Sequence, residues 1–189
     1  MKKGLIALLA AFLLTGCGRT QSATITNPIT LNTTTADMSG YTQLTDNDPA
    51  FTAITIKESL RMFDEKGSGI IYYGMPYCDY CQAAVPELNT AAKTMGVTVY
   101  YVDVTNATAD DSYEDLKKAL ESTFKTNTSG QKDFMIPEVI AVKNGVIVDS
   151  HLSITSDYKT DYSKAVSLSE TQKLELQNIY KELMREAAD

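Results

Sequence analysis

Basic side chains are the minority among the charged residues of this sequence. Its 189 residues carry 17 Lys and Arg against 24 Asp and Glu, which gives a formal net charge of −7. An acidic chain repels the phosphate backbone of nucleic acids and the head groups of anionic lipids. The charge balance therefore argues against nucleic acid as a partner, and the length predicts one domain with a core of ordinary size.

The apolar run at the start of the chain is too short to span a bilayer. Lys2 and Lys3 precede an apolar stretch over residues 4–14, whereas a membrane-spanning helix needs roughly 20 residues. This order is typical of a signal peptide, which we place at residues 1–16. The stretch ends in Leu14-Thr15-Gly16-Cys17.

That ending resembles the lipobox of bacterial lipoproteins, in which the cysteine is diacylated and becomes the new N-terminus. The resemblance implies a bacterial extracytoplasmic lipoprotein, held at the membrane through lipid on Cys17. Two acyl chains give stable anchoring where one is marginal. An ordinary signal peptide with an incidental cysteine is the alternative.

Cysteine and histidine are scarce in the rest of the chain. With Cys17 lipidated, only Cys78 and Cys81 remain, and His151 is the sole histidine. A zinc site would need two further ligands, so no metal is expected. One pair is also no framework of structural disulfides.

A polar segment separates the leader from the expected domain. Residues 17–48 are rich in Thr, Ser, Asn and Gln, with few apolar residues at regular spacing. Such a composition predicts a flexible tether. A partly ordered strand near residues 25–31 is the alternative.

Residues 49–189 alternate between strand and helix patterns and form the predicted domain. Capping boxes begin at Thr55 and Ser169, and Asn144-Gly145 between two apolar runs predicts a hairpin. The resulting order, β-α-β-α-β-α-β-β-α, predicts an α/β fold whose mixed central sheet has helices on both faces. The expected strands are 51–54, 69–74, 97–103, 138–142 and 146–150, and the expected helices are 55–66, 82–95, 110–124 and 170–183.

The cysteine pair lies where a buried strand turns into a helix. Cys78 and Cys81 follow the strand at 69–74 and precede the helix that Gly96 closes. Free N–H groups and the positive dipole at a helix start stabilise a thiolate. We expect a redox-active pair in which Cys78 is the nucleophile and Cys81 the resolving cysteine, with a purely structural disulfide as the alternative.

Two separated motifs resemble thioredoxin. One is the cysteine pair with Pro86 in the following helix, and the other is Ile136-Pro137 directly before the hairpin with its Lys143-Asn144-Gly145 turn. The resemblance implies a thioredoxin fold, a cis Ile136–Pro137 bond and a substrate groove formed by Tyr77, Ile136 and Pro137. Tyr77 occupies the position of a tryptophan in thioredoxin.

The segment from Tyr72 to Gln82 is also similar to the bacteriocin-transport accessory proteins, whose site is of the Tyr-Ile-Gly-x-Pro-x-Cys-Pro-Tyr-Cys type. There are departures: Tyr72 stands where thioredoxin has a buried aspartate that helps to deprotonate the resolving cysteine. Asp79 replaces the usual Gly or Pro, so Asp79 and Tyr80 are expected to tune the pair. Residues 105–135 are longer than the matching stretch of thioredoxin.

These expectations combine into one function. The chain is predicted to be a membrane-anchored thiol–disulfide oxidoreductase, a reductant rather than a strong oxidant, that needs no cofactor beyond the Cys78–Cys81 disulfide. Its partners would be protein or peptide disulfides and dithiols, together with an external redox partner. The alternative is an accessory protein that holds an exported peptide, such as a bacteriocin, without redox turnover.

Overall fold

A six-stranded mixed sheet forms the centre of the molecule, with the strand order β1-β2-β4-β3-β7-β8. β4 pairs in parallel with β2 and β3, whereas β1 and the β7–β8 hairpin are antiparallel to their neighbours. The computed structural model describes residues 22–161 and 163–189. The elements are β1 (Thr34–Thr35), β2 (Phe51–Ala53), α1 (Ile56–Asp64), β3 (Gly69–Gly74), α2 (Asp79–Met95), β4 (Val99–Asp103), α3 (Tyr113–Ala119), β5 (Lys125–Thr126), β6 (Lys132–Asp133), β7 (Glu138–Lys143), β8 (Val146–Leu152) and α4 (Glu170–Ala187), with short 3-10 helices at Ala107–Ala109 and Glu121–Thr123.

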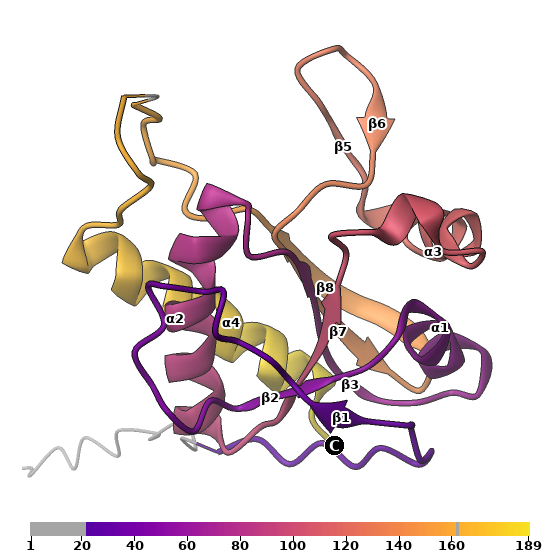
Figure 1. Ribbon diagram of the computed structural model, residues 1–189. Coiled ribbons are helices and arrows are strands. Elements are labelled where there is room, and N and C mark those ends of the chain that lie inside the picture. The colour runs from indigo at the N-terminus through magenta and orange to yellow at the C-terminus, as the bar shows by residue number, and fades with distance from the viewer. Residues whose placement is uncertain (1–21, 162) are drawn as a thin grey trace, which may run out of the picture.

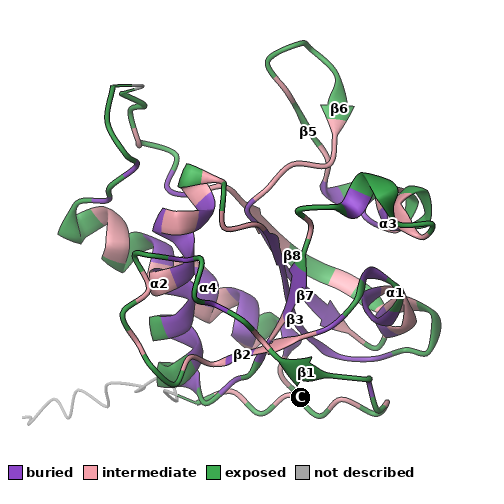
Figure 2. Cartoon of the chain, viewed as in Figure 1, coloured by how far each residue is buried: buried purple, intermediate pink, exposed green. Residues whose placement is uncertain are grey.

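Helices cover both faces of this sheet, as the alternating pattern predicts. α2 and α4 pack on one face, and α1 and α3 on the other (Figure 1). β3 is central and buried along its whole length, because its side chains point alternately into two cores. Ile70 and Tyr72 belong to the core under α2 and α4, and Ile71 and Tyr73 to the core under α1 and α3. Figure 2 shows the buried residues concentrated on the sheet and on the inner sides of α2 and α4.

Local signals in the sequence locate most of the element boundaries. The Thr55 side chain accepts the N–H of Glu58 at the start of α1, and Ser169 forms a full capping box with Gln172 at the start of α4. Gly96 ends α2 with a φ of 70°, a left-handed conformation that glycine adopts without a steric penalty. Asn144 and Gly145 both have positive φ in the β7–β8 turn. These short-range interactions depend only on neighbouring residues, so the sequence reveals them.

The segment before the expected domain is folded onto it, in contrast to the flexible tether that its composition predicts. Over the described residues 22–48, β1 pairs with β2, and Leu31, Met38 and Tyr41 are buried. Tyr41 is 1% exposed. The segment thus supplies apolar side chains that fill the cores. The strand suggested for residues 25–31 does not form; the strand lies at Thr34–Thr35.

Two further stretches differ from the sequence-based expectations. The helix expected over residues 110–124 is limited to α3, with a separate 3-10 turn at Glu121–Thr123. Within the long segment 105–135, β5 and β6 form a small hairpin, which projects away from the sheet (Figure 1). Its backbone hydrogen bonds are local, an ion pair of 3.3 Å between Lys117 and Asp133 joins it to α3, and its strand residues are largely exposed.

Candidate functional site

The two cysteines lie at the first turn of α2, as expected. Cys78 is the N-cap residue, with an extended backbone (φ −96°, ψ 117°), and its sulfur accepts the N–H of Cys81 at 3.3 Å. The first N–H groups of a helix have no intrahelical acceptor, and here one of them points at the Cys78 sulfur. α2 starts at Asp79, three residues before the predicted start, because the cysteine side chain itself caps the helix.

The two sulfurs differ sharply in their access to solvent. Cys78 is half-buried, whereas Cys81 is completely buried, and both are free thiols. A molecule that approaches this end of α2 meets Cys78 first. Cys81 presents no surface to solvent.

The surroundings of the two thiols shift their pKa values in opposite directions. The pKa of Cys78 is lowered to about 7, chiefly by a hydrogen bond from the Cys81 thiol. The backbone N–H groups of Cys81 and Tyr80 lower this pKa further. Burial of the sulfur and the negative charge of Asp79 oppose the shift. The pKa of Cys81 is raised well above that of a free thiol, because of its hydrogen bond to Cys78 and its burial. At neutral pH a large fraction of Cys78 is therefore thiolate, while Cys81 keeps its proton.

The aromatic neighbours of the pair lie in different surroundings. Tyr77 is 82% exposed, so a large apolar ring stands in solvent directly before Cys78. Tyr80 is held in place: its hydroxyl is 2.5 Å from the Thr160 hydroxyl, and its ring packs edge-on against Tyr158. Tyr80 thus connects the first turn of α2 to the segment between β8 and α4.

Ile136 and Pro137 lie at the same edge of the sheet as the cysteine turn. Glu138 pairs with Tyr73 in the β3–β7 register, which places the preceding Pro137 beside the end of β3, where the turn toward Cys78 begins. The Ile136–Pro137 bond is cis, as the resemblance implies. Pro137 is buried and Ile136 half-buried.

Tyr72 and Tyr41 are the residues near the pair that the sequence reasoning missed. The sequence assigns Tyr72 no role beyond standing in place of an aspartate, yet its hydroxyl interacts with Cys81 and favours the thiolate form of that residue. Tyr41, in the supposed tether, reaches Tyr72 with its hydroxyl at 3.4 Å. A signal was present: Met38, Tyr41 and Leu44 recur at intervals of three in a polar segment, and successive turns join them by backbone hydrogen bonds of 3.0 and 2.9 Å.

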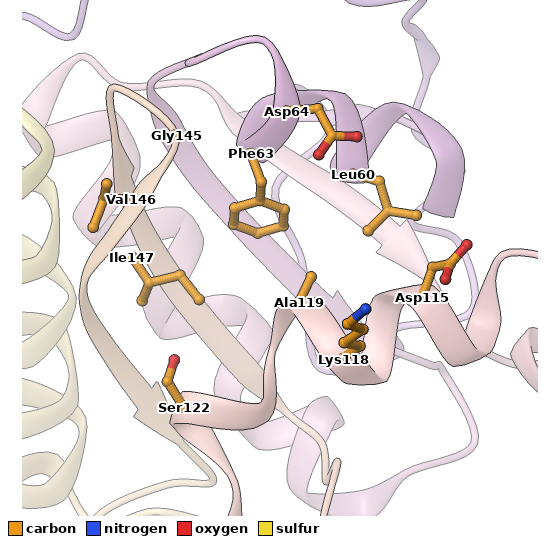
Figure 3. Close-up of a pocket in the computed structure, with 10 residues that line it drawn as sticks. All are labelled: Leu60, Phe63, Asp64, Asp115, Lys118, Ala119, Ser122, Gly145, Val146 and Ile147. Atoms are coloured by element: carbon orange, nitrogen blue, oxygen red, sulfur yellow. The ribbon is translucent and has the colours of Figure 1, made fainter.

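A separate pocket lies between α1, α3 and β8, on the sheet face opposite α2. Its volume is about 830 Å³, and its lining includes Leu60 and Phe63 of α1, Lys118 of α3 and Ile147 of β8 (Figure 3). The sheet separates this pocket from the cysteines. It therefore takes no part in chemistry at Cys78.

Cys17 and the expected leader lie outside the described residues. Within residues 22–161 and 163–189, none of the helices combines the length and the apolar character needed to cross a membrane. Comparison with known proteins does not assign the chain to a family: no family model matches it, and no curated sequence matches it significantly.

Proposed function

We propose that this chain is a thiol–disulfide oxidoreductase with a thioredoxin-like fold, in which Cys78 is the nucleophile and Cys81 the resolving cysteine. The observation that supports this most strongly is the asymmetry of the pair. One sulfur is accessible and acidic at a helix N-terminus, and the other is buried and retains its proton. A structural disulfide needs no such difference between its two sulfurs.

The exchange proceeds in two displacements. The Cys78 thiolate attacks a substrate disulfide, forms a mixed disulfide with one substrate sulfur and releases the other as a thiolate. Cys81 then loses its proton and attacks the Cys78 sulfur, so that the Cys78–Cys81 disulfide forms and the second substrate sulfur leaves and is protonated. The substrate disulfide is reduced by two electrons and the cysteine pair is oxidised. No further cofactor is required, although an external redox partner must restore the dithiol.

The thioredoxin-like assignment is supported by elements that are distant in sequence. The cysteine turn follows β3, and Ile136-Pro137 precedes β7, the antiparallel neighbour of β3. The exposed Tyr77 and the residues at Ile136 and Pro137 flank Cys78 at this edge, which suits an extended substrate segment. The central mixed sheet with helices on both faces is compatible with the same assignment.

Reduction is the favoured direction. A Cys78 pKa of about 7 equals that of thioredoxin, about 7, and is far from the value of about 3.5 for a dedicated oxidase. The less the thiolate is stabilised, the less the reduced form is favoured, so the pair gives up electrons readily.

The proposed location is the outer side of a bacterial cytoplasmic membrane, with lipid on Cys17 as the anchor. The support is the order of basic residues, apolar run and lipobox-like ending in the sequence. Substrates there would be disulfides of exported proteins or peptides. The acidic net charge speaks against nucleic acid as a partner.

Turnover of a protein disulfide tests the proposal. The full chain should catalyse the reduction of insulin by a small dithiol, and Cys78→Ser should abolish this activity. Cys81→Ser should instead accumulate a mixed disulfide between Cys78 and the substrate, visible by mass spectrometry. If the wild-type pair neither cycles nor reacts with alkylating reagents, the chain is better described as an accessory protein that holds an exported peptide.

A further inference from the structure

Three tyrosines from three separate segments meet beside Cys81. Tyr72 of β3 and Tyr101 of β4 are register partners whose rings stack at a centroid distance of 5.5 Å. Tyr41 lies across both rings, with its centroid 5.9 Å from that of Tyr101 and 6.4 Å from that of Tyr72. The three side chains are at most 3% exposed.

Their hydroxyls form a continuous chain. Tyr41 Oη donates to Tyr101 Oη at 3.1 Å and lies 3.4 Å from Tyr72 Oη. Since Tyr41 has one hydroxyl proton and gives it to Tyr101, Tyr72 must be the donor in the second contact. The protons therefore point in one direction, from Tyr72 through Tyr41 to Tyr101.

One end of this chain is at Cys81, which lies in the same core cluster as Tyr72 and whose thiolate form the Tyr72 hydroxyl favours. Gly74 makes this contact sterically feasible. A Cβ atom at Gly74 would lie 2.1 Å from Tyr72 Oη, so the phenol occupies the space that any other residue would fill. Tyr72 thereby extends along β3 toward the cysteine turn.

The other end is near the surface. Asp37 and Asp103 are exposed, and both interact electrostatically with Tyr101. The remaining titratable groups that face Cys81 are Cys78 and Tyr180 of α4. Among residues 22–161 and 163–189, the groups named as interacting with Cys81 include no cation, so a thiolate there depends on hydroxyl and backbone donors for its stabilisation.

We propose that Tyr72 is a further catalytic residue of the resolving step, because its hydroxyl takes the Cys81 proton, and that the Tyr72–Tyr41–Tyr101 hydroxyl chain carries this proton toward the surface. This inference rests on the proposed thiol–disulfide exchange. Without a proton acceptor, the buried Cys81 could not become the thiolate that the second displacement needs.

Tyr72 Oη takes the proton of Cys81 and passes its own to Tyr41, which passes its own to Tyr101, and Tyr101 releases a proton to water beside the exposed carboxylates. The Cys81 thiolate, now accepting a hydrogen bond from Tyr72, attacks the Cys78 sulfur. The bond from Cys78 to the substrate breaks, and the departing substrate thiolate takes a proton from water.

A chromogenic disulfide separates the two displacements. Reduced full-length protein is mixed with dithiobis(nitrobenzoate) in a stopped-flow instrument. The first nitrothiobenzoate released reports the attack by Cys78, and the second reports resolution by Cys81. Both rates are measured against pH for the wild type and the variants Tyr72→Phe, Tyr41→Phe and Tyr73→Phe.

Tyr73→Phe is the matched control, because Tyr73 is also fully buried in β3 but its hydroxyl lies on the opposite face of the sheet, with Ser59. We expect Tyr72→Phe to leave the first phase unchanged and to slow the second about tenfold or more at neutral pH, as the loss of a hydrogen bond to a charged group predicts. Its pH profile should move to higher pH. Tyr41→Phe should slow the second phase less, and Tyr73→Phe should change neither phase.

The proposal is overturned if the second phase of Tyr72→Phe matches the wild type, or if both phases slow equally, which would indicate a purely structural role. Should Tyr72→Phe fail to fold, as judged by circular dichroism, an unchanged second phase in Tyr41→Phe overturns it. A wild-type protein that shows no second phase would instead contradict the proposed function.

Discussion

Glu138 offers a sharp test of the electrostatics beside the cysteine turn. It is the first residue of β7, directly after Pro137, and it is only 2% exposed. Burial raises its pKa to about 7, although a hydrogen bond with Thr123 and the charge of Lys125 oppose the shift. Its Oε1 atom has no hydrogen-bond partner among the described residues, so the ionised form is poorly solvated.

The pKa of this carboxyl couples folding to pH. Between the ordinary value of 4.5 and about 7, the unfolded chain releases the Glu138 proton while the folded chain keeps it. The contribution of Glu138 to the free energy of unfolding therefore falls as the pH rises through this window and is constant outside it. At 1.36 kcal/mol for each pKa unit, the loss amounts to about 3 kcal/mol.

Glu138→Gln removes the ionisation and keeps the shape of the side chain. Urea unfolding, followed by circular dichroism from pH 4 to pH 8 under a fixed reducing agent, gives the free energy of unfolding of both proteins. The stability of the variant relative to wild type should increase by about 3 kcal/mol across this range. Cys78, whose pKa is lowered to about 7, also titrates close to this window, but it does so in both proteins, so the difference removes its contribution.

The exposed Glu175 in the middle of α4 supplies the control. Glu175→Gln should leave the pH dependence of the wild type unchanged. A stability difference between Glu138→Gln and wild type that is the same at pH 4 and pH 8 would refute the reasoning, because it would mean that the Glu138 carboxyl ionises as easily in the folded chain as in the unfolded one.

Three other changes give defined results. Asp79→Asn should lower the pKa of Cys78, since the like charge of Asp79 raises it, and the thiolate absorbance against pH measures this; an equal or higher pKa contradicts the assignment. Cys17→Ser should release the protein from membranes or stall its processing, and a variant that still fractionates with membranes at mature size argues against the lipid anchor. Gly96→Ala should destabilise the domain by about 1 kcal/mol in urea unfolding, because its φ of 70° is unfavourable for alanine; unchanged stability would show that the left-handed cap is dispensable.

The sequence alone determines the order of the main elements and the position of the cysteine pair. Strand β3 was predicted with its observed bounds, and Thr55, Gly96 and Ser169 begin or end helices through contacts with residues three or four positions away. Such signals are local, so a few neighbouring residues contain all the groups that form the contact. The position of Cys78 and Cys81 at a helix start belongs to this class, and the prediction of a redox-active pair rests on it.

The surroundings of the buried cysteine were decided by the tertiary structure. The spacing of Met38, Tyr41 and Leu44 indicates local turns, but it does not show where Tyr41 is buried, because the surface that receives it exists only once β3 and β4 are aligned. The register then brings Tyr72 and Tyr101 together, and the absent side chain of Gly74 lets one hydroxyl reach Cys81. Burial and long-range hydrogen bonds are properties of the assembled sheet. They set the pKa of Cys81, which cannot be inferred from the position of this residue in the sequence.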